Sequence, residues 1–279
     1  MLSETSSASS AVFAANRARG SVTFDVRAPD GVTRRGKLHE SGSLRVRFPS
    51  PEGAGLSGVF VNTAGGIAGG DLFNVDITAG EGSRLTLTTA AAEKVYRAAG
   101  RPSELNIALK VAVGAHLSWL PQETILFDRA RIARRIDIDL AEGGASLLLC
   151  EIVVFGRAAM GERMREGELV DRWRVRRGGR LILAETVRLD GDIGAKLARP
   201  AIANGAVAVA TALIVPGDEA LVEKIREISA SFGTEVGISA WNGFAMVRFC
   251  AQDAARLRTD VMAVLTRASG EALPRLWLT

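Results

Sequence analysis

Apolar side chains alternate with polar ones over most of this chain. The pattern is clearest at residues 44–48, 85–88 and 136–140, and Gly, Asp and Pro bound such runs from about residue 21 to residue 215. Successive side chains of a β-strand point to opposite faces, so a period of two predicts strands and not helices. We therefore expect a mainly β chain over this range.

A short Gly-x-x-Leu pattern repeats along this β-rich range. Its three copies, with glycines 32 and 30 residues apart, are Gly82 to Leu85, Gly114 to Leu117 and Gly144 to Leu147. Each copy follows an alternating run, so each unit reads as strand, glycine turn, strand and longer return. Such units stack as the coils of a β-solenoid or as two facing sheets. The three leucines should then occupy equivalent buried positions; a β-sandwich whose hairpins share glycine turns is the alternative.

The pattern changes after residue 217. Apolar residues in 218–231 and again in 253–268 recur at helical spacing, and Asp218 is placed to cap the first of these helices. A strand pair is expected between them, at about 237–250. The predicted organisation is a flexible tail at 1–20, a β-rich domain at 21–215, and an α+β segment at 216–279, packed on that domain, with about two α-helices near the C-terminus.

Composition and charge exclude several classes of function. The net charge is +4, but the basic residues are spread along the chain and aromatic residues make up only 5%, which does not fit a nucleic-acid surface. The longest weakly polar stretch, 201–215, is shorter than the roughly 20 residues of a membrane helix. Residues 1–10 lack a basic start before an apolar run, and Cys150 and Cys250 lie in apolar segments. We expect a cytoplasmic protein that binds neither nucleic acid nor membrane.

A glycine cluster precedes one of the predicted strands. It consists of Gly65, Gly66, Gly69 and Gly70, and is followed by Asp71. Neither the P-loop nor the dinucleotide-binding spacing is present, and the next element alternates like a strand. The glycines are therefore interpreted as a structural turn that requires positive φ or close backbone approach, with Asp71 at the start of the strand.

The residues needed for catalysis or tight metal binding are scarce. Only His39 and His116 are available as imidazole bases, and no Cys-x-x-Cys, His-x-His or His-Glu-x-x-His spacing occurs. We expect no catalytic residues, no tight metal site and no tightly bound cofactor. Any metal ion handled by this chain has to meet oxygen ligands.

Three carboxylates interrupt apolar segments that are predicted to be strands. They are Glu123, Glu151 and Glu185. An unpaired buried carboxylate is costly, so each one either points to solvent or lines a wet interior or an interface.

Six segments, read in order, resemble the hallmarks of the UreD/UreH family of urease accessory proteins. They are residues 65–71, 88–97, 119–127, 151–157 with 161–162, 185–191, and 274–279. The first sixty residues carry little of this resemblance. It implies a helical arrangement of β-strands with a few helices, in agreement with the repeat.

The resemblance also implies a function and partners. Similar proteins are non-enzymatic chaperones required for nickel insertion into apo-urease; they bridge urease to a helical accessory protein, UreF, and a nickel-carrying GTPase, UreG. Nickel is proposed to pass through an internal tunnel. Two alternatives stay open at this point: a pure docking scaffold without nickel contact, and a carbohydrate-active β-solenoid enzyme with paired carboxylates.

The most specific hypothesis that the resemblance permits is a path for nickel ions through the interior of the protein. Nickel binds imidazole and thiolate strongly, so a conduit poor in His and Cys suits nickel in transit. The residues expected to supply oxygen ligands or to shape the path are Asp71, Glu185, Glu151, Glu123, Thr88, Thr89 and Lys94. Of these, Asp71 and Glu185 are the strongest candidates because each adjoins a family-like turn.

Overall fold

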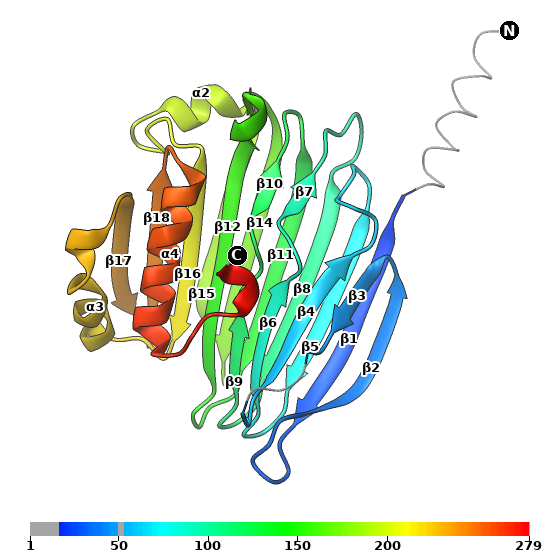
Figure 1. Cartoon of the computed structure of the whole chain (residues 1–279), viewed down its shortest axis with the longest axis vertical. Coiled ribbons are helices and arrows are strands. Elements are labelled where there is room, and N and C mark those ends of the chain that lie inside the picture. The colour runs from blue at the N-terminus through cyan, green and yellow to red at the C-terminus, as the bar shows by residue number, and fades with distance from the viewer. Residues whose placement is uncertain (1–16, 50–52, 279) are drawn as a thin grey trace, which may run out of the picture.

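Two β-sheets that face each other form the body of the protein (Figure 1). The computed structural model describes residues 17–49 and 53–278. The first sheet contains β1 (Arg19–Arg27), β2 (Arg34–Gly42), β5 (Leu72–Ala79), β8 (Ser103–Val111), β11 (Arg131–Leu140), β14 (Glu166–Arg177) and β15 (Arg180–Asp192). Its strand order is β15-β14-β11-β8-β5-β1-β2.

The second sheet has eleven strands. They are β3 (Leu44–Arg47), β4 (Leu56–Asn62), β6 (Arg84–Thr89), β7 (Glu93–Val95), β9 (His116–Trp119), β10 (Thr124–Leu126), β12 (Ser146–Arg157), β13 (Glu162–Arg163), β16 (Ala208–Val215), β17 (Glu235–Trp241) and β18 (Phe244–Ala251). The main order is β17-β18-β16-β12-β9-β6-β4-β3, while β10 pairs with β12 and β7, and β13 pairs with β12.

The chain winds between the two sheets as a stack of coils. It crosses from the first sheet to the second between β5 and β6, between β8 and β9, and between β11 and β12. Equivalent strands of successive coils pair in parallel: β8 pairs with β5 and β11, and β9 pairs with β6 and β12. The predicted mainly β fold, a helical stack of strands with two facing sheets, is confirmed.

The glycine and leucine repeat follows this stack. Its glycines all have positive φ: Gly82 (63°), Gly114 (64°) and Gly144 (90°). A Cβ built on Gly114 would lie 3.9 Å from the Cα of Gly82, and one built on Gly144 would lie 3.8 Å from the Cα of Gly114. Leu117 pairs in register with Leu85 on one side and Leu147 on the other, and all three leucines are buried. The prediction of equivalent inward positions is confirmed.

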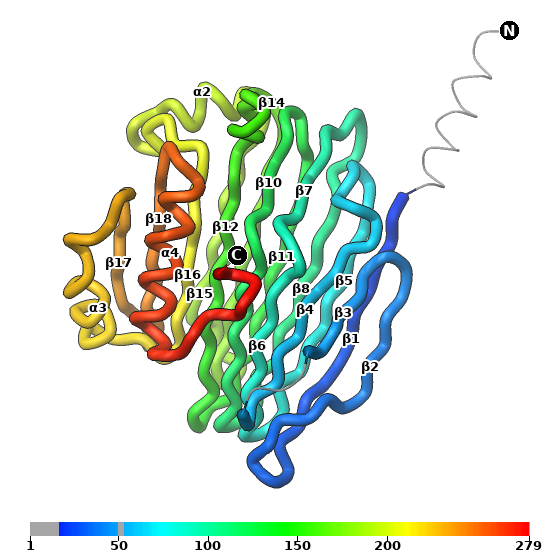
Figure 2. The backbone as a smooth tube through the Cα atoms, viewed as in Figure 1, coloured from blue at the N-terminus to red at the C-terminus, as the bar shows by residue number. Residues whose placement is uncertain are grey.

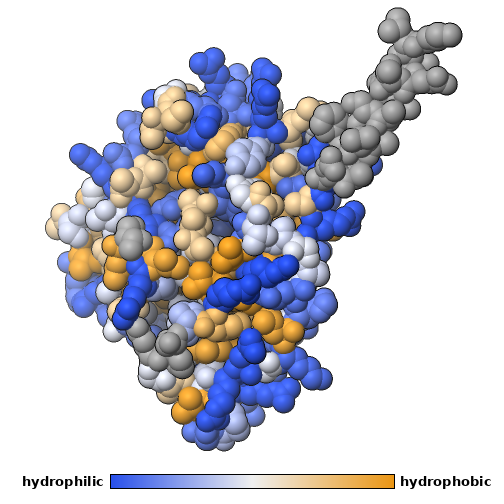
Figure 3. All heavy atoms as spheres, turned by 45° about the vertical axis from the view of Figure 1, so that its right-hand side comes forward, coloured by the Kyte–Doolittle hydropathy of each residue, from blue (hydrophilic) through white to orange (hydrophobic). Residues whose placement is uncertain are grey.

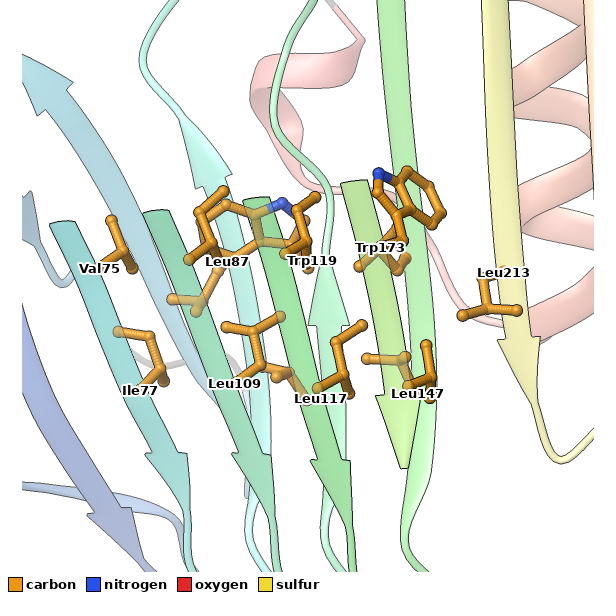
Figure 4. Close-up of a cluster of buried hydrophobic side chains, with 14 of the residues drawn as sticks. Val75, Ile77, Leu87, Leu109, Leu117, Trp119, Leu147, Trp173 and Leu213 are labelled. Atoms are coloured by element: carbon orange, nitrogen blue, oxygen red, sulfur yellow. The ribbon is translucent and has the colours of Figure 1, made fainter. Parts of the chain in front are cut away.

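The main core fills the space between the sheets. Val75, Ile77 and Leu109 point inward from the first sheet toward Leu87 and Leu117 of the second (Figure 4). The alternating sequence accounts for this, because every second side chain of a strand faces the opposite sheet.

A second core covers the outer face of the second sheet. There α4 (Ala254–Ser269) lies across β16 and β18, and its Leu257 and Val261 pack in one cluster with Cys150 and Ile152 of β12 (Figure 1). Strand β12 is therefore buried on both faces, which explains why its residues are apolar on both sides apart from Glu151. The C-terminal end of the chain lies over the middle of this sheet, where Trp277 Nε1 donates to the carbonyl of Leu120 at 2.9 Å (Figure 2).

Three α-helices follow β15, of which two were predicted. These two are α3 (Glu219–Arg226), capped by Asp218, and α4. The third, α2 (Ile193–Ala198), was not predicted; it is a six-residue helix whose first turn is capped by Asp192. None of the helices in residues 17–49 and 53–278 has the length and apolar character that crossing a bilayer requires.

The predicted division into a tail and two parts stays a prediction. Residues 1–16 of the predicted tail lie outside the described residues, and Arg19 already belongs to β1. In the C-terminal part, β18 pairs with β16 and with β17, so these strands continue the second sheet.

Candidate functional site

A buried arginine joins the two sheets across the core. Arg134 lies on β11 at the inward position between Ile132 and Ile136, where the alternating pattern calls for an apolar residue. Asp171 is its register partner on the neighbouring strand β14, and Glu151 extends from β12 of the opposite sheet. The exposed fractions of the three side chains are 3% for Arg134, 4% for Glu151 and 11% for Asp171. Water therefore contributes little to solvating these charges.

The guanidinium of Arg134 binds both carboxylates. Nη1 donates to Glu151 Oε2, Nη2 donates to Asp171 Oδ2 at 2.5 Å, and Nε donates to Asp171 Oδ1 at 3.0 Å. Two indoles complete the network: Trp119 Nε1 donates to Glu151 Oε1 at 2.8 Å, and Trp173 Nε1 donates to Asp171 Oδ1 at 3.0 Å. We call Arg134, Glu151 and Asp171 the ion triad.

The ion triad has one more negative than positive charge when all three groups are ionised. Burial raises the pKa of Glu151, and Asp171 adds to that rise, whereas Arg134 opposes it. Burial alone would lower the pKa of Arg134, but the two carboxylates outweigh it and raise that pKa. The arginine thus stays charged, and Glu151 holds a proton more readily than an exposed glutamate does.

Two cavities between the sheets meet at the ion triad. The first has a volume of about 330 Å³ and extends to Gly66, Glu93 and Lys94. The second has a volume of about 540 Å³ and extends to Glu185 and other residues of β15, β17 and β18. Among the described residues, Arg134 and Glu151 are the two that line both cavities. A path from one cavity to the other therefore passes the ion triad.

Glu93 is a carboxylate of the first cavity that was not predicted as a site residue. Its two carboxylate oxygens each lie 3.3 Å from Asn62 Nδ2. Burial raises the pKa of Glu93 to about 7, against the weaker lowering effect of the Asn62 hydrogen bond. Glu93 lies inside the segment 88–97 that carries the family resemblance, directly before Lys94. That position was the signal by which it could have been found.

The stability of the protein is expected to depend on pH through Glu93. Below about pH 4.5 the Glu93 carboxyl group is protonated in both the folded and the unfolded chain. Between about pH 4.5 and 7 it is protonated only in the folded chain. The free energy of unfolding therefore falls as the pH rises through this range. A glutamine side chain does not titrate, so Glu93→Gln should not show this fall in the free energy of unfolding. At about pH 8 the variant should be more stable than the wild type by on the order of 2 kcal/mol, allowing for partial exposure of Glu93.

The measurement is urea unfolding of the wild type and Glu93→Gln at about pH 4 and pH 8. All other groups titrate in the same way in both proteins. The difference in the free energy of unfolding between wild type and variant therefore reports on Glu93 alone. A difference that is the same at both pH values would contradict the prediction.

Three of the four predicted carboxylates, Glu151, Glu185 and Glu123, have arginine partners that are distant in sequence. Glu151 pairs with Arg134 in the ion triad. Glu185 lines the second cavity and binds Arg248 Nη2 at 2.8 Å. Glu123 binds Arg258 of α4 at 2.5 Å and lies in the link between β9 and β10, so its prediction as a strand residue was wrong. The structure brings Glu151 and Glu185 to the second cavity, while Glu123 lines neither of the two cavities that meet at the ion triad.

Asp71 has a structural environment. It is 3% exposed, and its carboxylate accepts hydrogen bonds from the backbone N–H of Ala18 at 2.8 Å and of Ala68 at 2.7 Å. It therefore fastens the start of β1 to the glycine turn, and it does not line either cavity at the ion triad.

The remaining predicted path residues divide between the first cavity and the outer face. Thr89 and Lys94 line the cavity. Thr89 Oγ1 accepts from Gln122 N at 2.9 Å and donates to Ala91 O at 2.9 Å. Thr88 follows the inward residue Leu87, so it points to the other side of the sheet. It is buried, and its hydroxyl has no hydrogen-bond partner among the described residues.

The glycine cluster forms the turn before β5. Gly65, Gly66 and Gly70 have φ values of 76°, 144° and 84°. A Cβ on Gly66 would lie 2.4 Å from the Tyr96 ring, and a Cβ on Gly69 would lie 2.4 Å from that of Ala98. The first cavity reaches this turn at Gly65 and Gly66.

The chemistry of the site is that of buried charged oxygen and nitrogen groups. Within residues 17–49 and 53–278, no group of three or more His, Cys, Asp or Glu side chains is arranged to hold a metal ion. The pair Glu151 and Asp171 presents its oxygens to a single cationic group, Arg134. The fold and this site define a two-sheet β scaffold whose interior cavities meet at a buried ion triad.

Comparison with known proteins gives the family. The family described as "UreD urease accessory protein" matches residues 17–278. Proteins named urease accessory protein UreD are 77% identical in Rhodopseudomonas palustris (strain BisB18), over 96% of this chain and 97% of that relative, and 77% identical in Bradyrhizobium diazoefficiens, over 98% of each chain. A third, urease accessory protein UreD 3 of Bradyrhizobium sp. (strain BTAi1), is 74% identical over 100% of both chains.

The chain belongs to the UreD family of urease accessory proteins. The resemblance inferred from six segments is confirmed. The family match starts at residue 17, so it also covers residues before the first of the six segments. Membership gives no support to the carbohydrate-active alternative.

Proposed function

We propose that this protein is a non-enzymatic, cytoplasmic chaperone that assists nickel insertion into apo-urease. In this proposal it bridges urease to UreF-like and UreG-like accessory proteins, and nickel passes through its interior without a tightly bound cofactor. The observation that carries the conduit is the meeting of two cavities at Glu151 and Arg134. Carboxylate oxygens suit transit, because nickel binds imidazole and thiolate more strongly.

The carboxylates of the conduit are spread along both cavities. Glu93 lies in the first cavity, Glu151 lies where the two cavities meet, and Glu185 and Glu235 lie in the second. Such a series offers successive weak sites, and its ends reach opposite sides of the ion triad. The proposed ion path therefore runs along Glu93, Glu151 and Glu185, while Asp71 holds the turn before β5.

The docking scaffold is the second candidate function. Large apolar side chains are exposed, among them Met160 (72%), Leu278 (64%) and Leu181 (47%). On the face shown in Figure 3, apolar residues gather in patches between charged ones. Exposed patches of this kind are typical of surfaces that bind other proteins. A scaffold and a conduit are compatible, so the experiment has to separate them.

The test replaces Glu151 and Glu185 by Gln together and measures two quantities separately. The first is assembly of the variant with apo-urease and the accessory proteins, and the second is the nickel content of the urease obtained. A conduit predicts normal assembly with reduced nickel. Glu81→Gln, an exposed residue of the turn between β5 and β6, is the matched control and should change neither quantity.

The other outcomes reject the conduit. Normal nickel content in the double variant would show that these carboxylates are not needed for transit. Loss of assembly together with nickel would show that these carboxylates support the fold or the docking surface and would give no support to transit. Asp71→Asn is a useful comparison, because it weakens the turn without touching either cavity and should act through folding and assembly.

A further inference from the structure

We propose that the outer face of β14 binds an extended acidic segment of a protein partner through three arginines, Arg172, Arg174 and Arg176, which we call the arginine row. The inference gives a partner chemistry to the docking scaffold, and it rests on the proposed function only in assuming that a protein partner binds this chain. The arginine row lies apart from the two cavities that meet at the ion triad.

The alternation of side chains along β14 places the arginine row on the outside of the first sheet. Trp173, between two of the arginines, points into the core (Figure 4). Its neighbours in the strand therefore point to the opposite face. Arg172 is exposed, and Arg174 and Arg176 are half-buried. Residues two apart on a strand are separated by about 7 Å, so the row presents its guanidinium groups at this interval along one line.

The arginine row lacks carboxylate partners. Arg172 and Arg176 have no hydrogen bond or ion pair within residues 17–49 and 53–278. Arg174 donates from Nη1 to the carbonyl oxygens of Trp173 at 2.8 Å and of Glu185 at 2.9 Å. These two hydrogen bonds to the backbone hold the central guanidinium against the sheet. Less side-chain entropy is then lost when a carboxylate of a partner binds it.

Neighbouring arginines on the same face are paired. The pairs are Arg131 with Glu168 at 2.7 Å, Arg135 with Asp137, and Arg188 with Asp190 at 2.9 Å. These carboxylates are therefore used by arginines outside the row. The row keeps its positive charge, and three like charges along one strand are unfavourable until anionic groups bind them.

The two sides of the arginine row differ in charge and in size. On β11, its neighbours in register include Asp137 and Asp139, which repel an anion. On β15, its neighbours in register are Thr186 and Ala184, which are small, exposed and uncharged. Strand β15 is also the last strand of the sheet. A chain that lies over β15 therefore reaches the guanidinium groups and avoids the carboxylates of β11.

An extended acidic segment matches this surface in spacing and in width. When its carboxylates occur at every second residue, they repeat at about 7 Å, as the arginines of the row do. Guanidinium and carboxylate groups form strong, charge-assisted and often bidentate hydrogen bonds. A nucleic acid fits less well, because the phosphates of a broader polyanion would also meet Asp137 and Asp139. Negative charge on one side of the row thus selects for a narrow partner.

The test measures binding of a labelled peptide to the full-length chain by fluorescence anisotropy. The probe is a peptide of about nine residues in which Glu alternates with Thr. We expect Arg172→Gln combined with Arg176→Gln to weaken its binding by at least about tenfold. The matched control is Arg27→Gln combined with Arg34→Gln, which removes the same charge from exposed pairs near the other edge of the sheet. It should change the affinity by less than about twofold.

A second comparison uses the wild-type chain alone. A peptide of the same composition with its Glu residues in one block has the same charge but not the spacing of the row, and it should bind more weakly than the alternating peptide. Both double variants should keep the thermal transition of the wild type, because all four arginines point away from the core.

Three results would overturn the proposal. Equal affinity of the two double variants for the alternating peptide would show that the arginine row does not bind it. Equal binding of the alternating and the block peptide would reject an extended partner in register with the row. Tighter binding of an oligothymidine, lost in the Arg172 and Arg176 variant, would assign the row to nucleic acid.

The peptide experiment contains neither urease nor an accessory protein, so its failure is distinct from failure of the proposed function. Absent peptide binding would count against the acidic-partner surface alone. Failed assembly with apo-urease and the accessory proteins, together with peptide binding that depends on the arginine row, would count against the proposed function alone.

Discussion

Replacing Arg134 by Met is expected to lower the free energy of unfolding by about 3–5 kcal/mol at neutral pH. The change leaves Glu151 and Asp171 buried in the core without the guanidinium that both of them bind. The pKa of Glu151 is already raised by burial, and the loss of Arg134 removes the attraction that opposes this rise. The variant should therefore bind a proton on folding, and its deficit should shrink as pH falls.

The control is the neighbouring residue on the same strand. Arg135 points outward, its side chain is 58% exposed, and it pairs with Asp137. Exposed ion pairs contribute about 0–1 kcal/mol, so Arg135→Met should change stability little. Urea unfolding of both variants at about pH 5 and pH 8 is the measurement. Equal stability of Arg134→Met and Arg135→Met at the higher pH would contradict the prediction.

A triple variant separates the cost of an unpaired charge from the contribution of the ion triad. Arg134→Met combined with Glu151→Leu and Asp171→Leu removes all three charges. Apolar replacement of a whole buried ion network is often neutral or stabilising. If the triple variant is as stable as the wild type, the ion triad contributes no net stability to the fold.

The sequence contained enough local information to predict the coils but not the ion triad. Gly114 and Leu117 occupy fixed positions in a strand-turn-strand unit, and the period of the repeat shows that the units are equivalent. Arg134 pairs with Glu151 and Asp171, which lie 17 and 37 residues further along the chain. Finding these partners requires the register between coils, which the alternating pattern of each strand does not specify.

Residues that depart from the alternating apolar and polar pattern of the strands indicated the site best. Arg134 is a charged residue at an inward position of an otherwise regular strand, and such a conflict between local pattern and burial is expected at functional sites. Asp71 was also a candidate because of its place in a family-like motif, but its carboxylate accepts hydrogen bonds from the backbone N–H groups of Ala18 and Ala68. A motif position alone did not distinguish a carboxylate that lines a cavity from one that fastens a turn.

Replacing Leu117 by Ala is expected to cost about 2–5 kcal/mol of unfolding free energy, as for other large-to-small changes in a core. Leu117 is fully buried on β9 and lies between Leu85 and Leu147 of the neighbouring coils. Parallel strands on both sides fix its backbone, so the coils cannot close on the space that the missing atoms leave. We therefore expect a value in the upper half of this range.

Leu181 provides the matched comparison for Leu117. It lies on the edge strand β15 and is 47% exposed. Leu181→Ala removes the same atoms from a strand without opening a cavity, and the change should stay within about 0.5 kcal/mol. Urea unfolding of the two variants side by side isolates the contribution of the inward leucine stack. If both changes lower the free energy of unfolding by the same amount, the prediction is contradicted. The stacked leucines of the repeat would then contribute no special stability to the two-sheet core.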